Sequence, residues 1–200
     1  MYPRKFENAI NAFRRLPGVG AKTAERYAYE VLSWDPELQE ELIKAMEELP
    51  KVKRCTVCGN LSEGDFCEYC SDPNRNKDMI CVVQSPKDIN AIENMGLYDG
   101  LYHVLNGAID TQKGILPENL NITSLLNRIS ENTKEIILAT DPTVEGETTA
   151  MYLSRLLSDK VKVTRLASGL PMGGHLDYSD SRTLQKAFTG RTKASNEQGI

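Results

Sequence analysis

Long apolar runs are the clearest absence in this 200-residue chain. The longest clearly apolar runs, such as Met79–Val83, span about five residues, whereas a membrane-spanning helix needs about 20. This excludes a membrane-spanning protein. The first residues, Met1-Tyr2-Pro3-Arg4-Lys5, also lack the apolar stretch of a secretory signal peptide, so we expect a cytoplasmic protein.

An excess of positive charge is also absent, because the formal net charge is -4. The charge is nevertheless uneven along the chain. Residues 1–29 carry six Lys or Arg and two acids, whereas the remaining residues carry 18 and 26. A basic end on an acidic body indicates an anionic partner for that end, although a solvated helix face would give the same pattern.

Composition and hydrophobic periodicity divide the chain into four parts. Residues 1–54 show helical spacing, interrupted by a glycine-rich stop at Leu16–Gly20 and by a second stop at Trp34–Pro36. Residues 55–78 are rich in cysteine and too poor in aliphatic residues to form a core without a cross-link such as a disulfide or a bound metal. Residues 79–170 alternate apolar runs with helical patterns, which predicts a parallel α/β sheet. Residues 171–200 form a C-terminal segment.

The predicted elements follow from these patterns. In the third part we expect strands at 79–83, 102–105, 135–139 and 162–166, with helices at 87–95, 124–130 and 145–157. The C-terminal segment is weakly helical around Ser181–Phe188, and the residues from about Thr192 have nothing to bury and are predicted to be disordered.

Two Cys-x-x-Cys pairs lie in the second part, with eight residues between them. Each pair presents two thiolates from one tight turn, which Gly59 suits after the first pair, and zinc prefers four such ligands in a tetrahedron. Two disulfides or a redox dithiol are the alternatives, but a segment without a core needs a metal to fold. We therefore predict a structural zinc site with no catalytic role. Its ligands are Cys55, Cys58, Cys67 and Cys70, while Cys81 is predicted to be a small buried hydrophobe.

A glycine-rich turn separates the first two predicted helices. Its glycines permit positive φ and close approach of a ligand, and the free N–H groups of the following helix form an anion site. Basic side chains flank the turn, a combination typical of a helix-hairpin-helix that grips the nucleic-acid backbone without reading bases. A turn used only for packing is the alternative. The candidate DNA-binding residues are Arg14, Arg15, Gly18, Gly20, Lys22, Thr23 and Arg26.

Acidic residues follow the third predicted strand, in the stretch Asp141–Glu147. The ends of parallel strands are where α/β sheets place their sites, and carboxylate oxygens suit Mg²⁺. Asp141, Glu145 and Glu147 are therefore candidate ligands for Mg²⁺ or contacts for a partner. The same residues are also common at the start of a helix, where Asp precedes the first turn and Glu within it complements the helix dipole. The local pattern alone leaves both interpretations open.

The combination of these motifs resembles the RecR family of bacterial recombination mediators. The resemblance rests on Leu-Pro-Gly-Val-Gly, the four cysteines, Asp-Pro-Thr-Val-Glu-Gly-Glu-Thr-Thr-Ala and Gly-Leu-Pro-Met-Gly-Gly in that order, and it covers about residues 1–191. It implies a helix-hairpin-helix region at 1–54, a zinc finger at 55–78, a Toprim-type domain at 79–170 and an interface segment at 171–200.

The resemblance also implies a function. Members assemble as dimers and ring-shaped tetramers that encircle single- or double-stranded DNA. They act with RecO and RecF in DNA repair to help load RecA on gapped or single-stranded DNA. The implied role is therefore that of a non-catalytic homo-oligomeric clamp in the cytoplasm, associated with the nucleoid.

Three positions depart from the expected patterns. Catalytic Toprim enzymes carry Glu after the first strand and Asp-x-Asp after the third, whereas this chain has Gln84 at the first place and Thr143 at the second. Gln cannot act as a general base or anchor a divalent ion as Glu does, which argues against strand cleavage or polymerisation. His175 stands where family members usually have Asp, in a loop at 169–180. We interpret this loop as an interface or tail-docking loop, with a local structural turn as the alternative.

Two other functions remain open at this stage. A Mg²⁺-dependent Toprim nuclease or primase would act through the acids after the third strand. A zinc-stabilised interaction scaffold would have no affinity for nucleic acid even at low salt, where non-specific phosphate binding is strongest.

Overall fold

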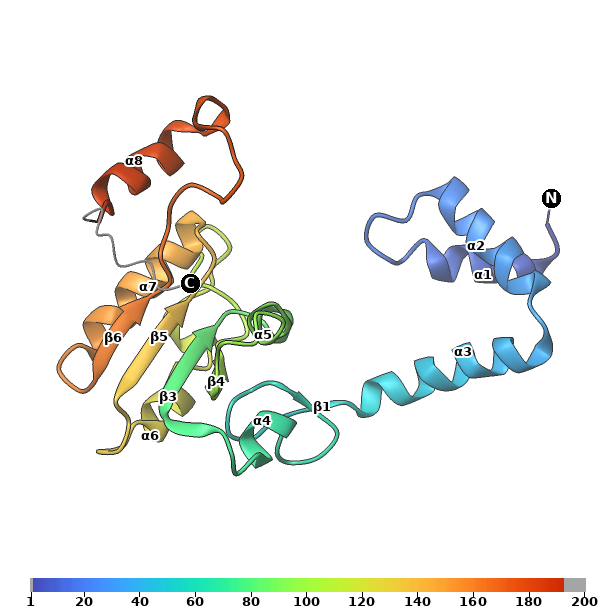
Figure 1. Cartoon of the computed structure of the whole chain (residues 1–200). Helices are drawn as coiled ribbons and strands as arrows, with labels where there is room; N and C mark the ends of the chain where they lie inside the picture. The colour runs from blue at the N-terminus through green and yellow to red at the C-terminus, as the bar shows by residue number, and fades with distance from the viewer. Residues whose placement is uncertain (1, 193–200) are drawn as a thin grey trace. The chain divides into compact units, whose positions relative to one another are not determined.

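The computed structural model describes residues 2–192 and divides the chain into two compact units, one ending at Val52 and the other beginning at Lys53 (Figure 1). The first unit consists of helices α1 (Arg4–Phe13), α2 (Ala21–Ser33) and α3 (Pro36–Glu48), followed by a short 3₁₀ turn at Leu49–Lys51. This confirms the helical interpretation of the N-terminal part.

Small and aromatic side chains hold the first two helices together. Ala24 and Ala28 of α2 are buried, which lets the α1 backbone approach closely. The ring centroids of Phe6 and Tyr29 lie 4.7 Å apart. The predicted stop before α3 is also present, because Asp35 caps the helix by accepting from the N–H of Leu38 at 2.9 Å, with proline at the first helical position.

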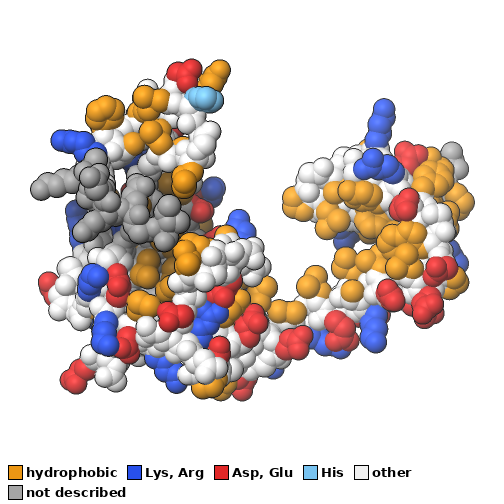
Figure 2. All heavy atoms as spheres, viewed as in Figure 1, with side chains coloured by type: hydrophobic (Ala, Val, Ile, Leu, Met, Phe, Trp, Pro, Cys, Tyr) orange, Lys and Arg blue, Asp and Glu red, His pale blue; other side chains and the backbone are white. Residues whose placement is uncertain are grey.

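An apolar hollow of about 550 Å³ lies among the three helices of this unit. Figure 2 shows hydrophobic side chains gathered over these helices. Leu32 and Ile43 are more than half exposed there. Fifty residues cannot bury all their apolar surface, so this unit leaves a hydrophobic face on its outside.

The second unit contains a four-stranded sheet. Its strands are β3 (Asn76–Val83), β4 (Gly100–Val104), β5 (Glu135–Ala139) and β6 (Lys162–Arg165). Their order is β4-β3-β5-β6 and all pairings are parallel. The connecting helices are α5 (Pro86–Glu93), α6 (Ile122–Arg128) and α7 (Val144–Leu157). All four predicted strands are thus confirmed, with ends that differ from the prediction by at most three residues.

The side chains of β3 alternate between two cores. Ile80 and Val82 pack in one core with Leu125 of α6 and Leu153 of α7. Cys81 and Val83 face the other core, which contains Ile89 of α5. Helices therefore cover both faces of the sheet, as a parallel sheet requires. Burial raises the pKa of Cys81 to about 12, and its prediction as a buried hydrophobe is confirmed.

The cysteine-rich segment lies against the edge strand β4 (Figure 1). It contains a two-stranded hairpin, β1 (Lys53–Arg54) with β2 (Leu61–Ser62), and the short helix α4 (Glu68–Ser71). The N–H of Val104 donates to the carbonyl of Cys58 at 2.7 Å. The segment and the sheet thus form one compact unit, while the expected boundaries at 54/55, 78/79 and 170/171 stay predictions.

After β6 the chain runs through an exposed stretch with a 3₁₀ turn at Leu176–Tyr178 and ends in α8 (Ser181–Thr189). Asp180 caps α8, which confirms the predicted helix. His175 is exposed, and the interface role of its loop stays a prediction. The expected disordered tail beyond Thr192 lies outside the described residues. No helix between residues 2 and 192 is both long and apolar enough to cross a membrane.

Candidate zinc centre and nucleic-acid interface

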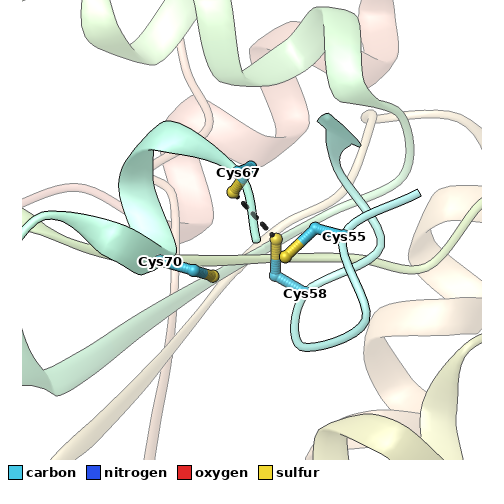
Figure 3. A group of neighbouring side chains, drawn as sticks. All are labelled: Cys55, Cys58, Cys67 and Cys70. Carbon is cyan, nitrogen blue, oxygen red and sulfur yellow. Dashed lines mark hydrogen bonds between the residues drawn. The ribbon is translucent and has the colours of Figure 1, made fainter. Parts of the chain in front are cut away.

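The four predicted zinc ligands converge on one point (Figure 3). The sulfur atoms of Cys55, Cys58, Cys67 and Cys70 all lie within 4.8 Å of one another, and the Sγ atoms of Cys58 and Cys67 are 3.5 Å apart. Tetrahedral zinc with Zn–S bonds of about 2.3 Å places its sulfurs about 3.8 Å apart, so the donor set fits this ion. All five cysteines of the chain are free thiols in the structure, which speaks against the disulfide alternative.

Local backbone bonds form the first knuckle of this centre. The N–H of Cys55 donates to the carbonyl of Asn60 at 2.7 Å, and the N–H of Gly59 donates to the carbonyl of Cys55 at 2.9 Å. Gly59 has φ +77°, a conformation that favours glycine, as the sequence suggested. The amide N–H of Asn60 points at the sulfur of Cys58 at 3.4 Å, a contact that favours a thiolate.

The environment shifts the pKa values of the thiols in opposite directions. Burial raises the pKa of Cys55, but N–H groups of the knuckles outweigh burial and lower it to about 7. The hydrogen bond with Cys70, followed by burial, raises the pKa of Cys58. A bound zinc ion offsets the cost of such a buried thiolate, because its charge lies in contact with the sulfur. With four thiolates the site is closed and leaves no position for a reacting water.

The glycine-rich turn of the first unit has the backbone that its sequence predicts. The N–H of Val19 donates to the carbonyl of Leu16 at 3.1 Å, and Gly18 has φ +78°. A Cβ built at Gly18 or Gly20 would meet nothing within 4 Å among the described residues. Packing therefore does not explain why Gly20 lacks a side chain, and the surface above it is open to a ligand.

The start of α2 leaves backbone donors free at this turn. Gly20 precedes the helix and provides no side-chain cap. The first backbone bond at this end is the N–H of Ala24 to the carbonyl of Gly20, at 2.9 Å. The N–H groups of Ala21, Lys22 and Thr23 therefore have no intrahelical acceptor. Such a set of N–H groups at the positive end of a helix suits a phosphate oxygen.

Cationic side chains surround these free N–H groups. Lys22 and Arg26 are one helical turn apart on α2 and both are exposed. Arg14 and Arg15 are exposed just after α1, whereas Thr23 is half-buried. None of the four cations forms an ion pair with another of the described residues. Their charge is thus available to an external anion, as the sequence suggested.

The acids after β5 have a different arrangement from a metal site. Asp141 is exposed, and its backbone N–H donates to the side-chain oxygen of Gln84 at 2.6 Å. This bond joins the ends of β3 and β5, the strands at which the order of the sheet changes direction. The side chain of Gln84 therefore forms a structural hydrogen bond between the ends of two strands.

The carboxylate of Glu147 forms ion pairs with two cationic side chains. Its carboxylate lies 3.0 Å from Arg165 Nη1 and 2.6 Å from Lys186 Nζ of α8. These partners, Arg165 first, lower the pKa of Glu147 to about 2. Among the described residues the four cysteines are the one group of three or more potential ligands close enough for a metal, so Asp141, Glu145 and Glu147 do not gather around one point.

The start of α7 explains part of the acidic motif. Thr143, not Asp141, caps this helix by accepting from the N–H of Gly146 at 3.1 Å. Glu145 and Glu147 lie in its first turn, where negative charge complements the helix dipole. A Cβ at Gly146 would lie 2.0 Å from the carbonyl oxygen of Asp141, so the loop packs too tightly for any other residue. The helix-start interpretation therefore accounts for these residues without a metal.

Comparisons with known proteins agree with this arrangement between residues 6 and 192. Residues 6–50 match the family described as "RecR, helix-hairpin-helix", 52–72 match the RecR zinc finger domain with four cysteines, 78–167 match "Toprim domain" and 169–192 match "RecR, C-terminal". The protein named "Recombination protein RecR" from Natranaerobius thermophilus is 48% identical over 193 residues, covering 95% of this chain and 97% of that protein. A protein of the same name from Clostridium perfringens is 46% identical, covering 96% of this chain and 98% of its own length.

The chain belongs to the RecR family.

RecR membership confirms the resemblance on which the sequence interpretation relied, together with the α/β fold and the structural zinc site. The four matched segments correspond to the helical unit, the cysteine module, the parallel sheet and the exposed C-terminal stretch.

Sequence reasoning missed several contacts of this RecR chain. It gave Gln84 no structural partner, and it assigned no role to Arg165 or Lys186, the partners of Glu147. No local signal could have revealed these bonds, because they join residues 18 to 57 positions apart. It also overlooked Asn106, although Asn106-Gly107 is a dipeptide typical of a turn with positive φ.

Proposed function

We propose that this chain is a non-catalytic DNA-binding mediator of recombinational repair. The observation that carries the proposal is the open N-terminus of α2, where free N–H groups meet Lys22 and Arg26, neither of which is ion-paired within the described part of the chain. Phosphate contacts of this kind hold single- or double-stranded DNA without reading sequence. The names of the relatives support the recombination role.

The proposed active form is a homo-oligomer, either a dimer or a ring-shaped tetramer. The anion site at the start of α2 is small, so one copy of it binds DNA weakly, and linked copies gain avidity. The hydrophobic face of the first unit supports assembly, since exposed apolar patches of this kind mark protein contacts. In such an assembly the basic turns face the DNA and the acidic residues face outward.

The proposed partners are RecO and RecF, with which the protein would help RecA load on gapped or single-stranded DNA in the cytoplasm, at the nucleoid. Exposed Asp141 and half-buried Glu145 are available for a basic partner surface. The engagement of Gln84 with Asp141 and of Glu147 with two cations argues against a Mg²⁺-dependent nuclease or primase.

The test is a pair of charge-matched double variants. Lys22→Gln with Arg26→Gln removes two cations at the turn, while Lys44→Gln with Lys87→Gln removes two exposed cations elsewhere. Loss of two phosphate contacts reduces the magnitude of the slope of log K against log salt by about 1.8 for each chain that contacts the duplex. The control pair keeps the wild-type slope.

The readout is fluorescence anisotropy of labelled duplex DNA over a salt series. An unchanged slope in the Lys22/Arg26 variant, or an equal loss in both variants, would refute the assignment of the turn. The same protein preparations, incubated with labelled DNA and Mg²⁺, should leave the strands intact. Cleavage that disappears in Asp141→Ala would establish the enzyme alternative instead.

A further inference from the structure

A second polar site lies in the second unit, where the zinc module meets the end of β4. It is a cleft of about 470 Å³, a size within the range of about 300–1,000 Å³ common for small-molecule pockets. No carboxylate lies among its lining residues, although acids outnumber bases in the chain. Its polar lining residues are Arg54, Thr56, Asn106, Asn119, Asn121 and Ser124.

The three asparagines leave hydrogen-bonding groups free in this cleft. Asn121 donates from Nδ2 to the carbonyl of Val104 at 3.1 Å, which leaves its Oδ1 as an acceptor. Asn119 accepts at Oδ1 from the N–H of Leu116 at 2.8 Å, which leaves its Nδ2 as a donor. The Asn106 side chain forms no hydrogen bond with the other described residues. The cleft thus offers both amide donors and amide acceptors.

The walls of the cleft are fixed by close backbone packing. A Cβ at Gly59 would lie 2.9 Å from Nδ2 of Asn121 and 3.0 Å from the carbonyl oxygen of Val104, so the zinc knuckle touches the sheet directly. Asn106 has φ +62° and is the one described residue other than glycine with positive φ. Few residue types adopt this backbone conformation, and the side chain of Asn106 lines the cleft.

The charge of the cleft comes from the basic hairpin strand β1. Arg54 contributes its guanidinium and donates to the carbonyl of Gly59 at 3.3 Å, and its neighbour Lys53 is exposed on the same strand. The chemistry of the cleft is therefore a cation for a phosphate and amides for the polar edge of a planar heterocycle.

We propose that this cleft holds one unpaired nucleotide of a single DNA strand. Arg54 contacts the phosphate and the amides of Asn106 and Asn119 bond to the edge of the base. A base inside a duplex cannot enter, so the cleft favours single strands, whereas the turn at α2 grips the backbone of either form. The proposal rests on the proposed DNA-binding function and adds a second contact that depends on the base.

The test compares two single strands of equal length and charge, one with bases and one made of abasic sites. The wild-type protein should bind the strand with bases more tightly. Asn106→Gly allows the positive φ and removes the side chain with its amide, so it should fold normally and lose about tenfold in affinity for the strand with bases. Its affinity for the abasic strand and for duplex DNA should stay at the wild-type value.

Two further variants keep the result interpretable. Asn132→Gly, at an exposed turn outside the cleft, is the matched control and should bind as the wild type does. Arg54→Gln should weaken binding of both single strands, because it removes the phosphate contact. Equal binding of the two strands by wild-type protein, or an unchanged Asn106→Gly variant, overturns this proposal while leaving the α2 site intact. The Lys22/Arg26 variant tests the proposed function separately, because it removes the contacts at α2 and leaves the cleft unchanged.

Discussion

Removal of zinc should loosen the edge of the parallel sheet as well as the cysteine module itself. Cys58 links the metal site to the sheet. Its sulfur is one of the four predicted zinc ligands, and its carbonyl accepts a hydrogen bond from the N–H of Val104 at 2.7 Å. Tyr69 of the same module packs edge-on against Tyr102 of β4, with centroids 5.2 Å apart. The substitution Cys58→Ser breaks the tetrahedral site and so frees both contacts.

The expected loss in the free energy of unfolding can be worked out from these two contacts. Leaving the N–H of Val104 without an acceptor costs about 1–3 kcal/mol, and the aromatic pair contributes about 1 kcal/mol. The free energy of unfolding of the second unit should therefore fall by about 3 kcal/mol. At about 2–4 °C per kcal/mol for a chain of this size, the Tm should fall by about 6–12 °C.

The assay is thermal unfolding followed by far-UV circular dichroism, with zinc content measured on the same samples. Cys81→Ala is the matched control, because Cys81 is a buried cysteine outside the centre. It should keep the full zinc content, while Cys58→Ser should lose it. A zinc-free Cys58→Ser protein with the Tm of the wild type would refute the role of the metal in holding β4.

Two predictions concern acid pH. Arg165 and Lys186 lower the pKa of Glu147 from 4.5 to about 2, so their stabilisation of α8 is present above pH 4.5 and is lost as the pH falls through about 2. Glu147→Gln should abolish this stabilisation at pH 7, and amide hydrogen exchange in α8 should then be faster than in the wild type. Unchanged exchange would contradict the role of the ion pairs. Burial lowers the pKa of His103 from 6.5 to about 4, so the unfolded chain takes up this proton first and stability falls as the pH drops from 6.5 to about 4. Urea unfolding at several pH values measures this fall, and an NMR titration of His103 with a midpoint near 6.5 would contradict it.

Features that depend on neighbouring residues in the chain could be predicted from the sequence. The strands and helices of the sheet follow from hydrophobic spacing, and the end of α2 follows from Asp35-Pro36. The zinc ligands and the glycine of the knuckle follow from spacing and from the geometry of a tight turn. These signals are local, so a single sequence contains them.

Features that depend on distant residues could not be predicted in this way. Gln84 bonds to a residue 57 positions away, and Glu147 pairs with Lys186, 39 positions away. The polar cleft combines residues of β1 with those of the loops that precede α6. The hairpin β1–β2 and the helix α4 were also missed, because elements of two to four residues show no periodicity.

Light scattering of the purified protein, with and without DNA and at several salt concentrations, tests the central claim most directly. A DNA-binding clamp built from several chains should give a mass that is a multiple of 22.3 kDa, and this mass should rise on addition of DNA and return as the salt concentration increases. A particle of 22.3 kDa whose mass does not change with DNA at low salt would contradict the account.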